Sequence, residues 1–166
     1  PLEGHGLRWI QPEVPLAHPL DGGRVALLER SIDATAAGFA GDDGRAWAGM
    51  MEPLARSGSG LVDSLLSPLA IPPRAPIALA RFGLEGIRSA SGLARSRFEH
   101  DEPRALFAGL AAHSMLPLES PITAGYGLMI GLLGHQVGWP VAEGGSQSIV
   151  AALVSLLGAL GGTVET

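Results

Sequence analysis

Three short stretches carry side chains that could do chemistry, and we interpret each of them as structural. Residues 57–60 read Ser-Gly-Ser-Gly, which lacks the leading glycine of a hydrolase nucleophile elbow and the strand and helix around it. His100, Asp101 and Glu102 are adjacent, so their side chains point in different directions, and no second histidine stands at the helical spacing of a zinc protease. His113 falls on the apolar face of a predicted helix, as a hydrogen-bonded core histidine would. We therefore predict no catalytic residue and no metal ligand.

The composition excludes several classes of protein. The 166 residues include no cysteine, which excludes disulfide frameworks, thiolate metal sites and cysteine nucleophiles. They include no lysine either, so a Schiff base cannot form on a side chain. The 11 arginines face 16 acidic residues, giving a net charge of −5 without a basic stripe, and we expect no nucleic-acid partner. Hydrophobic residues at 46% and charged residues at 16% predict a globular domain with much apolar surface to bury.

One long uncharged stretch, residues 120–142, raises the question of a membrane span. Pro121, His135 and Pro140 confine its continuous apolar part to 122–133, shorter than the roughly 20 residues that a spanning helix needs. We predict a buried core helix there and no transmembrane span. The start of the chain has no basic region followed by an apolar stretch, so we predict no signal peptide. We expect a cytoplasmic protein, with peripheral attachment to a membrane left open.

Hydrophobic periodicity and turn signals predict many short helices and few strands. A turn at 21–23 predicts a hairpin between the extended segments around it. Extended segments are predicted at 7–10, 14–16, 24–29, 137–141 and 163–166. Helices are predicted at 32–39, 45–55, 61–66, 77–88, from 101 onward, at 122–133 and at 147–160, with Ser31, Asp43, Asp101 and Ser146 as their N-caps. The predicted fold is a single α+β domain over 1–166, mostly helical, with a few short strands from both ends of the chain.

Residues 138–164 form the most informative segment. An extended stretch leads to the paired Gly144 and Gly145, and the helix that follows ends in a second glycine pair before Val164. Paired glycines let a backbone pass close to a flat or bulky group, and the helix N-terminus attracts electron-rich groups. Many helices begin with such a pattern, so by itself it identifies no ligand.

This segment resembles a glycine-rich stretch of the phytoene desaturase and amine-oxidase superfamily of FAD-dependent oxidoreductases, although its spacing from proline to the first glycine pair is longer by two. The matching residues are Pro140, Gly144, Gly145, Ala152, Leu153, Gly161, Gly162 and Val164. Bacterial phytoene dehydrogenase-related flavoproteins are also similar to residues 6–10, 15–23, 33–36 and 105–114.

The resemblance implies that these residues are the central, substrate-binding portion excised from a larger flavoprotein, whose Rossmann FAD-binding portion is absent. The flavin of the full-length parent would carry out hydride transfer on an apolar small-molecule substrate. No G-x-G-x-x-G follows a predicted strand, so we expect the chain alone to bind no FAD and to be inactive. The FAD-binding domain of the same polypeptide would be its partner, and apolar surface exposed by excision would favour self-association.

The resemblance also suggests site residues. Trp139, Pro140, Gly144 and Gly145 would face the junction of flavin and substrate. The candidates for the wall of the substrate site are Tyr126, Met129 and Leu133, each of which could instead belong to the core. The alternative is a non-enzymatic helical module that binds an apolar ligand or a partner protein. A dinucleotide-binding glycine fingerprint about 100–150 residues upstream in the reading frame would favour the flavoprotein.

Overall fold

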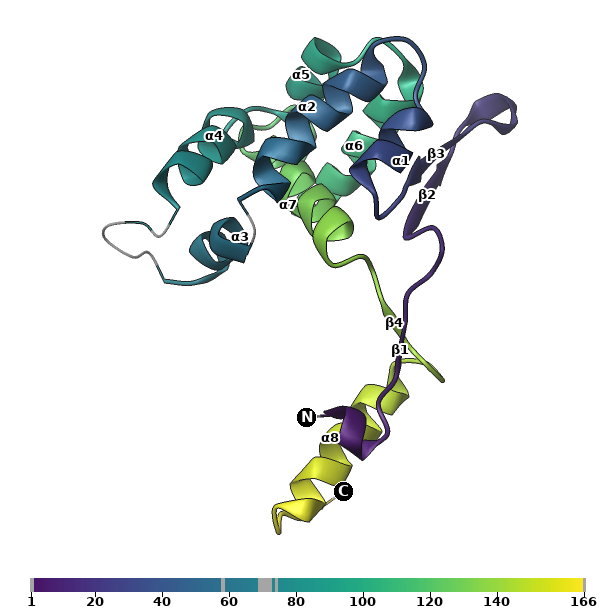
Figure 1. Ribbon diagram of the computed structural model, residues 1–166, viewed down its shortest axis with the longest axis vertical. Helices are drawn as coiled ribbons and strands as arrows, with labels where there is room; N and C mark the ends of the chain where they lie inside the picture. Colours follow the sequence, from purple (N-terminus) through teal and green to yellow (C-terminus); the bar gives the residue numbers. More distant parts are fainter. Residues whose placement is uncertain (1, 58, 69–72, 74, 166) are drawn as a thin grey trace. The chain divides into compact units, whose positions relative to one another are not determined.

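The computed structural model describes residues 2–57, 59–68, 73 and 75–165 (Figure 1). Its helices account for 59% and its strands for 8% of the structure, so the predicted α+β, mostly helical class is confirmed. Contacts divide the chain into two compact units, Val14–Gly138 and the pair of segments Pro1–Glu13 and Trp139–Thr166. This division does not test the expectation of one domain over 1–166.

The larger unit is a set of helices around one central helix, α7. A β-hairpin precedes them, formed by β2 (Leu16–Pro19) and β3 (Val25–Leu28). The helices are α1 (Ile32–Ala37), α2 (Asp43–Ala55), α3 (Ser59–Leu66), α4 (Pro76–Gly86), α5 (Ala90–Arg97), α6 (Asp101–Ala111) and α7 (Thr123–Gln136). α7 packs against α2, α4, α5 and α6, with α6 its most extensive neighbour (Figure 1).

The hairpin confirms the pairing predicted around residues 21–23. Its antiparallel register runs from Leu16 opposite Leu28 to Pro19 opposite Val25. Gly22 and Gly23 have φ of 74° and 76°, conformations that favour glycine. The hairpin is held on α6 by His18, whose Nδ1 donates to the carbonyl of Ala105 at 3.1 Å.

Glycines on α7 let its neighbours approach closely. A Cβ placed at Gly127 would lie 2.9 Å from the Phe107 ring, and one placed at Gly134 would lie 2.7 Å from Leu28. This geometry gives the glycines of α7 a role in core packing. The large side chains buried around them are Trp47, Met51, Leu93, Phe98, Leu106, Phe107, Leu110, Leu128 and Leu132.

Several sequence predictions about this unit need correction. Helix α5 was not predicted, although Ser89 caps it by accepting from the amide of Gly92 at 3.2 Å. His113 is exposed, on a short 3₁₀ turn (Ala112–Ser114) after α6, and is no core histidine. Asp43 and Asp101 are the first residues of their helices and not the N-caps. The predicted cap at Ser31 is confirmed, because its side chain accepts from the amide of Ala34.

The smaller unit joins the two ends of the chain. A 3₁₀ helix (Leu2–His5) packs on α8 (Gln147–Ala159), and His5 Nδ1 hydrogen-bonds with Ser155 Oγ at 3.0 Å. Strands β1 (Trp9–Ile10) and β4 (Val141–Ala142) pair antiparallel. Residues 163–165 have no regular structure, so they do not form the predicted final strand, and Thr166 lies outside the described residues. None of the described helices combines the length and apolar character that crossing a membrane requires.

Candidate ligand site

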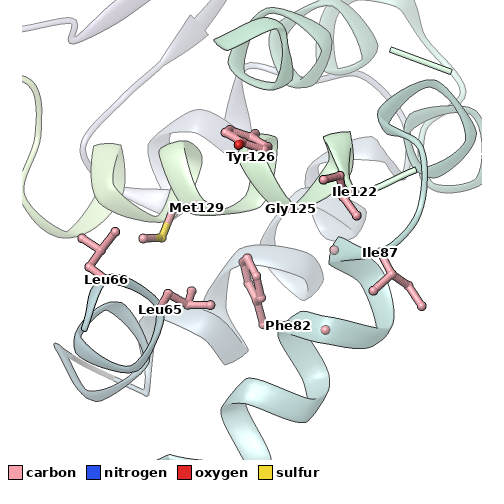
Figure 2. Close-up of a pocket in the computed structure, with 10 residues that line it drawn as sticks. Leu65, Leu66, Phe82, Ile87, Ile122, Gly125, Tyr126 and Met129 are labelled. Atoms are coloured by element: carbon pink, nitrogen blue, oxygen red, sulfur yellow. The ribbon is translucent and has the colours of Figure 1, made fainter. Parts of the chain in front are cut away.

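An apolar pocket of about 470 Å³ opens between α3, α4 and α7 (Figure 2). No charged residue is among the described residues that line it, and Tyr126 supplies the one hydroxyl group. A pocket of this size and character is typical of small-molecule sites. Its walls are formed by Leu65, Leu66, Phe82, Gly83, Gly86, Ile87, Ile122, Gly125, Tyr126 and Met129.

The end of α4 and the start of α7 are in backbone contact at one end of this pocket. A Cβ at Gly86 would lie 3.3 Å from Cα of Gly125, and a Cβ at Gly125 would lie 3.2 Å from the carbonyl oxygen of Gly86. The amide of Ile122 donates to the carbonyl of Ile87 at 3.0 Å, which ties the two segments together. The relative position of α4 and α7 is therefore fixed where the pocket begins.

Ile122 is strained. Its φ is 69°, in the left-handed region where a β-branched residue is a genuine outlier. Such conformations cost of order 1–3 kcal/mol and persist where surrounding structure imposes them, often at ligand sites. The strained residue lines the pocket.

The pocket includes two of the three residues predicted for a substrate wall. Tyr126 and Met129 lie one turn apart on α7 and both line the pocket, and Met129 points toward Leu65 and Leu66 of α3 (Figure 2). Leu133, one further turn along, is half-buried and is not among the lining residues. Helices α3 and α4 also contribute to the pocket, and none of their residues was predicted to do so. The sequence did contain one sign of these contributions, because the short predicted helices there carry large apolar residues such as Leu65, Leu66 and Phe82.

The four residues predicted for cofactor contact belong to the smaller unit. Trp139 and Pro140 are half-buried and precede β4, and Gly144 and Gly145 follow it. The two glycines have φ of 79° and 92°. The amide of Gly145 donates to the carbonyl of Ala142 at 3.0 Å, which closes a tight turn before α8.

This turn accounts for both glycines without a cofactor. Their positive φ disfavours any other residue. A Cβ at Gly144 would lie 3.1 Å from Ser148 Oγ, whereas one at Gly145 would meet no atom within 4 Å. The open space beside Gly145 could accommodate a flat group, but open space alone does not indicate a binding site for FAD. The described conformation of Gly144 and Gly145 thus needs no flavin to explain it, and FAD binding by the full-length parent stays a prediction from the resemblance.

The buried histidine of the protein is His135, not His113. It is 8% exposed, and its Nε2 accepts from the indole N–H of Trp47 at 3.1 Å. Its Nδ1 donates to the carbonyl of Arg30 at 3.3 Å. Burial lowers the pKa of His135, against the opposing effect of backbone carbonyls. Because both ring nitrogens are engaged, the side chain is structural.

Asp43 and His100 form a second histidine interaction. Oδ2 of the buried carboxylate lies 3.0 Å from Nδ1 of His100, and the carboxylate also accepts from the amides of Glu99 and His100 at 2.8 Å. Burial acts to raise the pKa of Asp43, but these hydrogen bonds hold it below its usual value. These contacts hold the segment before α6 against the start of α2. Among the residues that the structure describes, no three His, Asp or Glu side chains are grouped as metal ligands.

Comparison with protein-family models, with curated proteins and with solved structures finds no match for this chain.

Proposed function

We propose that the larger unit binds an apolar small molecule in the pocket between α3, α4 and α7. The observation that carries this proposal is the pocket itself, which has a volume of about 470 Å³ and whose described lining residues carry no charge and one hydroxyl, at Tyr126, to orient a ligand. The strained φ of Ile122 on its wall is a second support, because strain of this kind clusters at ligand sites.

The finer proposal is that this molecule is the substrate of an FAD-dependent oxidoreductase similar to phytoene dehydrogenases. It rests on the sequence resemblance, and the occurrence of Tyr126 and Met129 in one pocket agrees with it. The flavin would supply the hydride acceptor, and the residues of this chain would hold the substrate and exclude water. We propose that the FAD-binding domain is part of the same polypeptide and that the protein works in the cytoplasm.

A second candidate function, the binding of a partner protein, is favoured by the exposed apolar residues of α8. This helix has no charged side chain, and four of its large apolar residues are between 41% and 50% exposed. Surfaces of this kind are typical of interaction sites. The residues are Val150, Leu153, Val154 and Leu157.

Glycine-to-leucine substitutions test the pocket with little risk to the fold. Gly83 lines the pocket, lies inside α4 and has open space where a Cβ would stand. Gly83→Leu should fill the pocket and weaken binding of the fluorescent probe N-phenyl-1-naphthylamine at least tenfold. The matched control is Gly49→Leu on α2, which also faces open space but lies outside the pocket. Equal binding by the two variants would contradict the proposed site.

The flavoprotein proposal has a separate test. FAD titrated into the purified chain should leave the visible spectrum of FAD unchanged, because the dinucleotide fingerprint is missing from this sequence. Stoichiometric yellow protein after gel filtration would contradict the proposal that the FAD-binding residues lie in another part of the polypeptide.

A further inference from the structure

We infer that Phe82 determines the ligand length that the apolar pocket accepts, by closing it against a second cavity on the other flank of α4. The inference rests on the proposed function, because it concerns the same pocket. In Figure 2 the ring of Phe82 projects from α4 toward α7, with Leu65, Leu66 and Met129 on one side. Phe82 is the one described residue that lines both cavities.

The second cavity has a volume of about 220 Å³ and lies between α2, α4, α5 and α7. Its base is apolar and is formed by Met50, Leu54 and Leu128. Its rim carries Arg81, Glu85 and Arg97, of which the last two form an ion pair. Two arginines and one glutamate leave this rim with an excess of positive charge.

The helical geometry of α4 explains why Phe82 is the residue that separates the apolar pocket from the second cavity. Gly83, Gly86 and Ile87 face the apolar pocket, whereas Arg81, Leu84 and Glu85 face the second cavity. These two sets occupy opposite flanks of the helix, given its 100° rotation per residue. Phe82 stands between them.

Among the described residues, the backbones of α4 and α7 meet at the end of α4 and block passage between the two cavities there. One turn after Phe82, the backbones of Gly86 and Gly125 are in contact, so the helices leave no gap there. The Phe82 ring extends along Gly86, since a Cβ placed on that glycine would lie 3.4 Å from Cε1 of the ring. The ring therefore occupies the space that an elongated ligand would need in order to pass between α4 and α7.

This arrangement specifies the class of ligand. The native pocket accepts compact apolar molecules that end against Phe82. A molecule long enough to pass it would place its chain against Met50, Leu54 and Leu128 and its far end near Arg81. Removing the ring should therefore favour long chains over short ones, and should do so only while the second cavity is empty.

The test compares 1-octanol and 1-hexadecanol as competitors of N-phenyl-1-naphthylamine, measured by fluorescence on the full chain. In Phe82→Ala, the affinity for 1-hexadecanol relative to 1-octanol should rise about tenfold over the native ratio, as expected from burying about two more methylene groups. Phe82→Leu, which keeps more of the side-chain volume, should shift the ratio in the same direction by a smaller factor.

The double variant Phe82→Ala/Gly49→Leu provides the decisive control. Gly49 lines the second cavity, and a leucine there would fill it from an open position on α2. The long-chain preference should return to the native ratio in this variant, whereas Gly49→Leu alone should leave the ratio unchanged. Circular dichroism of each variant establishes that it is folded.

The outcomes separate this inference from the function on which it rests. If the native chain binds neither alcohol, the proposed ligand site is wrong. If the native chain binds both alcohols but both Phe82 variants keep the native ratio of affinities, the ligand site stands. The inference that Phe82 limits ligand length is then overturned. A gain in long-chain affinity that persists in the double variant would also overturn it, because the added length would then lie elsewhere.

Discussion

The indole N–H of Trp47 on α2 donates to Nε2 of His135 on α7 at 3.1 Å, and both side chains are buried. This bond fixes the tautomer, because Nε2 must be the unprotonated nitrogen while Nδ1 donates to the carbonyl of Arg30. A single neutral imidazole thus joins two helices to the segment between β3 and α1. Protonating Nε2 would set two N–H donors against each other inside the core.

The stability of the protein should consequently depend on the protonation of His135. Burial holds the pKa of His135 below its ordinary value of 6.5 in the folded chain. The unfolded chain binds this proton more readily, so the free energy of unfolding should fall as the pH drops below about 6.5, until the folded pKa is reached. Urea denaturation at a series of pH values from 8 to 5 measures the loss.

His135→Gln is the matched variant for this prediction. A glutamine amide can accept from Trp47 and donate to Arg30 but does not titrate, so its stability should vary less between pH 6.5 and 5. The pKa values of Asp43 and Glu85 are held below 3.8 and 4.5, so their contributions are lost only at lower pH and should remain in both proteins. Parallel profiles above pH 5 would refute the role of His135.

The contact between α6 and α7 depends on Gly127. A methyl group there would lie 2.9 Å from two ring carbons of Phe107 and 3.3 Å from Cβ of Ala111, both of which are buried. We expect Gly127→Ala to destabilise the chain by up to about 2 kcal/mol, because overpacking costs about 1–3 kcal/mol and helix propensity returns only about 1 kcal/mol. Thermal denaturation followed by circular dichroism measures the change.

Gly49→Ala serves as the control for this substitution. Gly49 is also inside a helix but has no atom within 4 Å of an added Cβ, so alanine should stabilise by about 0.5–1 kcal/mol. The two substitutions should therefore change the free energy of unfolding in opposite directions. This difference separates the cost of overpacking at Gly127 from the gain in helix propensity that both alanines share. Stabilisation by both alanines would show that α6 and α7 do not approach closely at Gly127.

The helices that bury an apolar face could be predicted from the sequence, and those with weak apolar periodicity could not. Trp47, Met50, Met51 and Leu54 follow helical spacing, and all four are buried in α2 as the spacing predicts. Helix α5 has few large apolar residues and several polar ones, so its capping residue was the only strong local signal. Its stability comes from tertiary contacts with α6 and α7, which local sequence does not specify.

The same limit applies to polar residues and to the ligand site. His113 and His135 both follow apolar helical segments, and only the crossing of α2 over α7 decides which of them is buried. Tyr126 and Met129 line the pocket, but Leu133, proposed from the same apolar helix, does not, so the apolar character of α7 alone does not select the residues that line the pocket. Phe82 and Leu65 come from separate short helices, so their positions depend on tertiary packing.

The turn before α8 allows a prediction about Gly145. Because its φ is 92° and its surroundings are open, the cost of an alanine there is conformational and not steric. We expect Gly145→Ala to reduce the free energy of unfolding by about 1–2 kcal/mol. Gly158→Ala, inside α8 and also in open space, should increase it by about 0.5–1 kcal/mol. Equal effects would indicate that Gly145 adopts an ordinary negative φ.

The exposed face of α8 should cause self-association. Leu153 is 50% exposed on a helix without charged side chains, and its neighbours Val150 and Leu157 are also exposed. We expect concentration-dependent dimers in sedimentation equilibrium. Leu153→Glu should weaken them at least tenfold, because burying a leucine contributes about 1.5–3 kcal/mol and a factor of ten corresponds to about 1.4 kcal/mol.

A glutamate at an exposed apolar position outside α8 tests whether dimer formation depends on the face of α8 or on exposed apolar residues in general. Ile77 is 72% exposed in the first turn of α4, where an acidic side chain also suits the helix dipole. Ile77→Glu should leave the dimer dissociation constant within about twofold of the native value, since Ile77 lies outside α8. Equal weakening by Leu153→Glu and Ile77→Glu would mean that net charge, and not the face of α8, controls association. A native chain that stays monomeric at millimolar concentration would remove α8 as a self-association surface altogether.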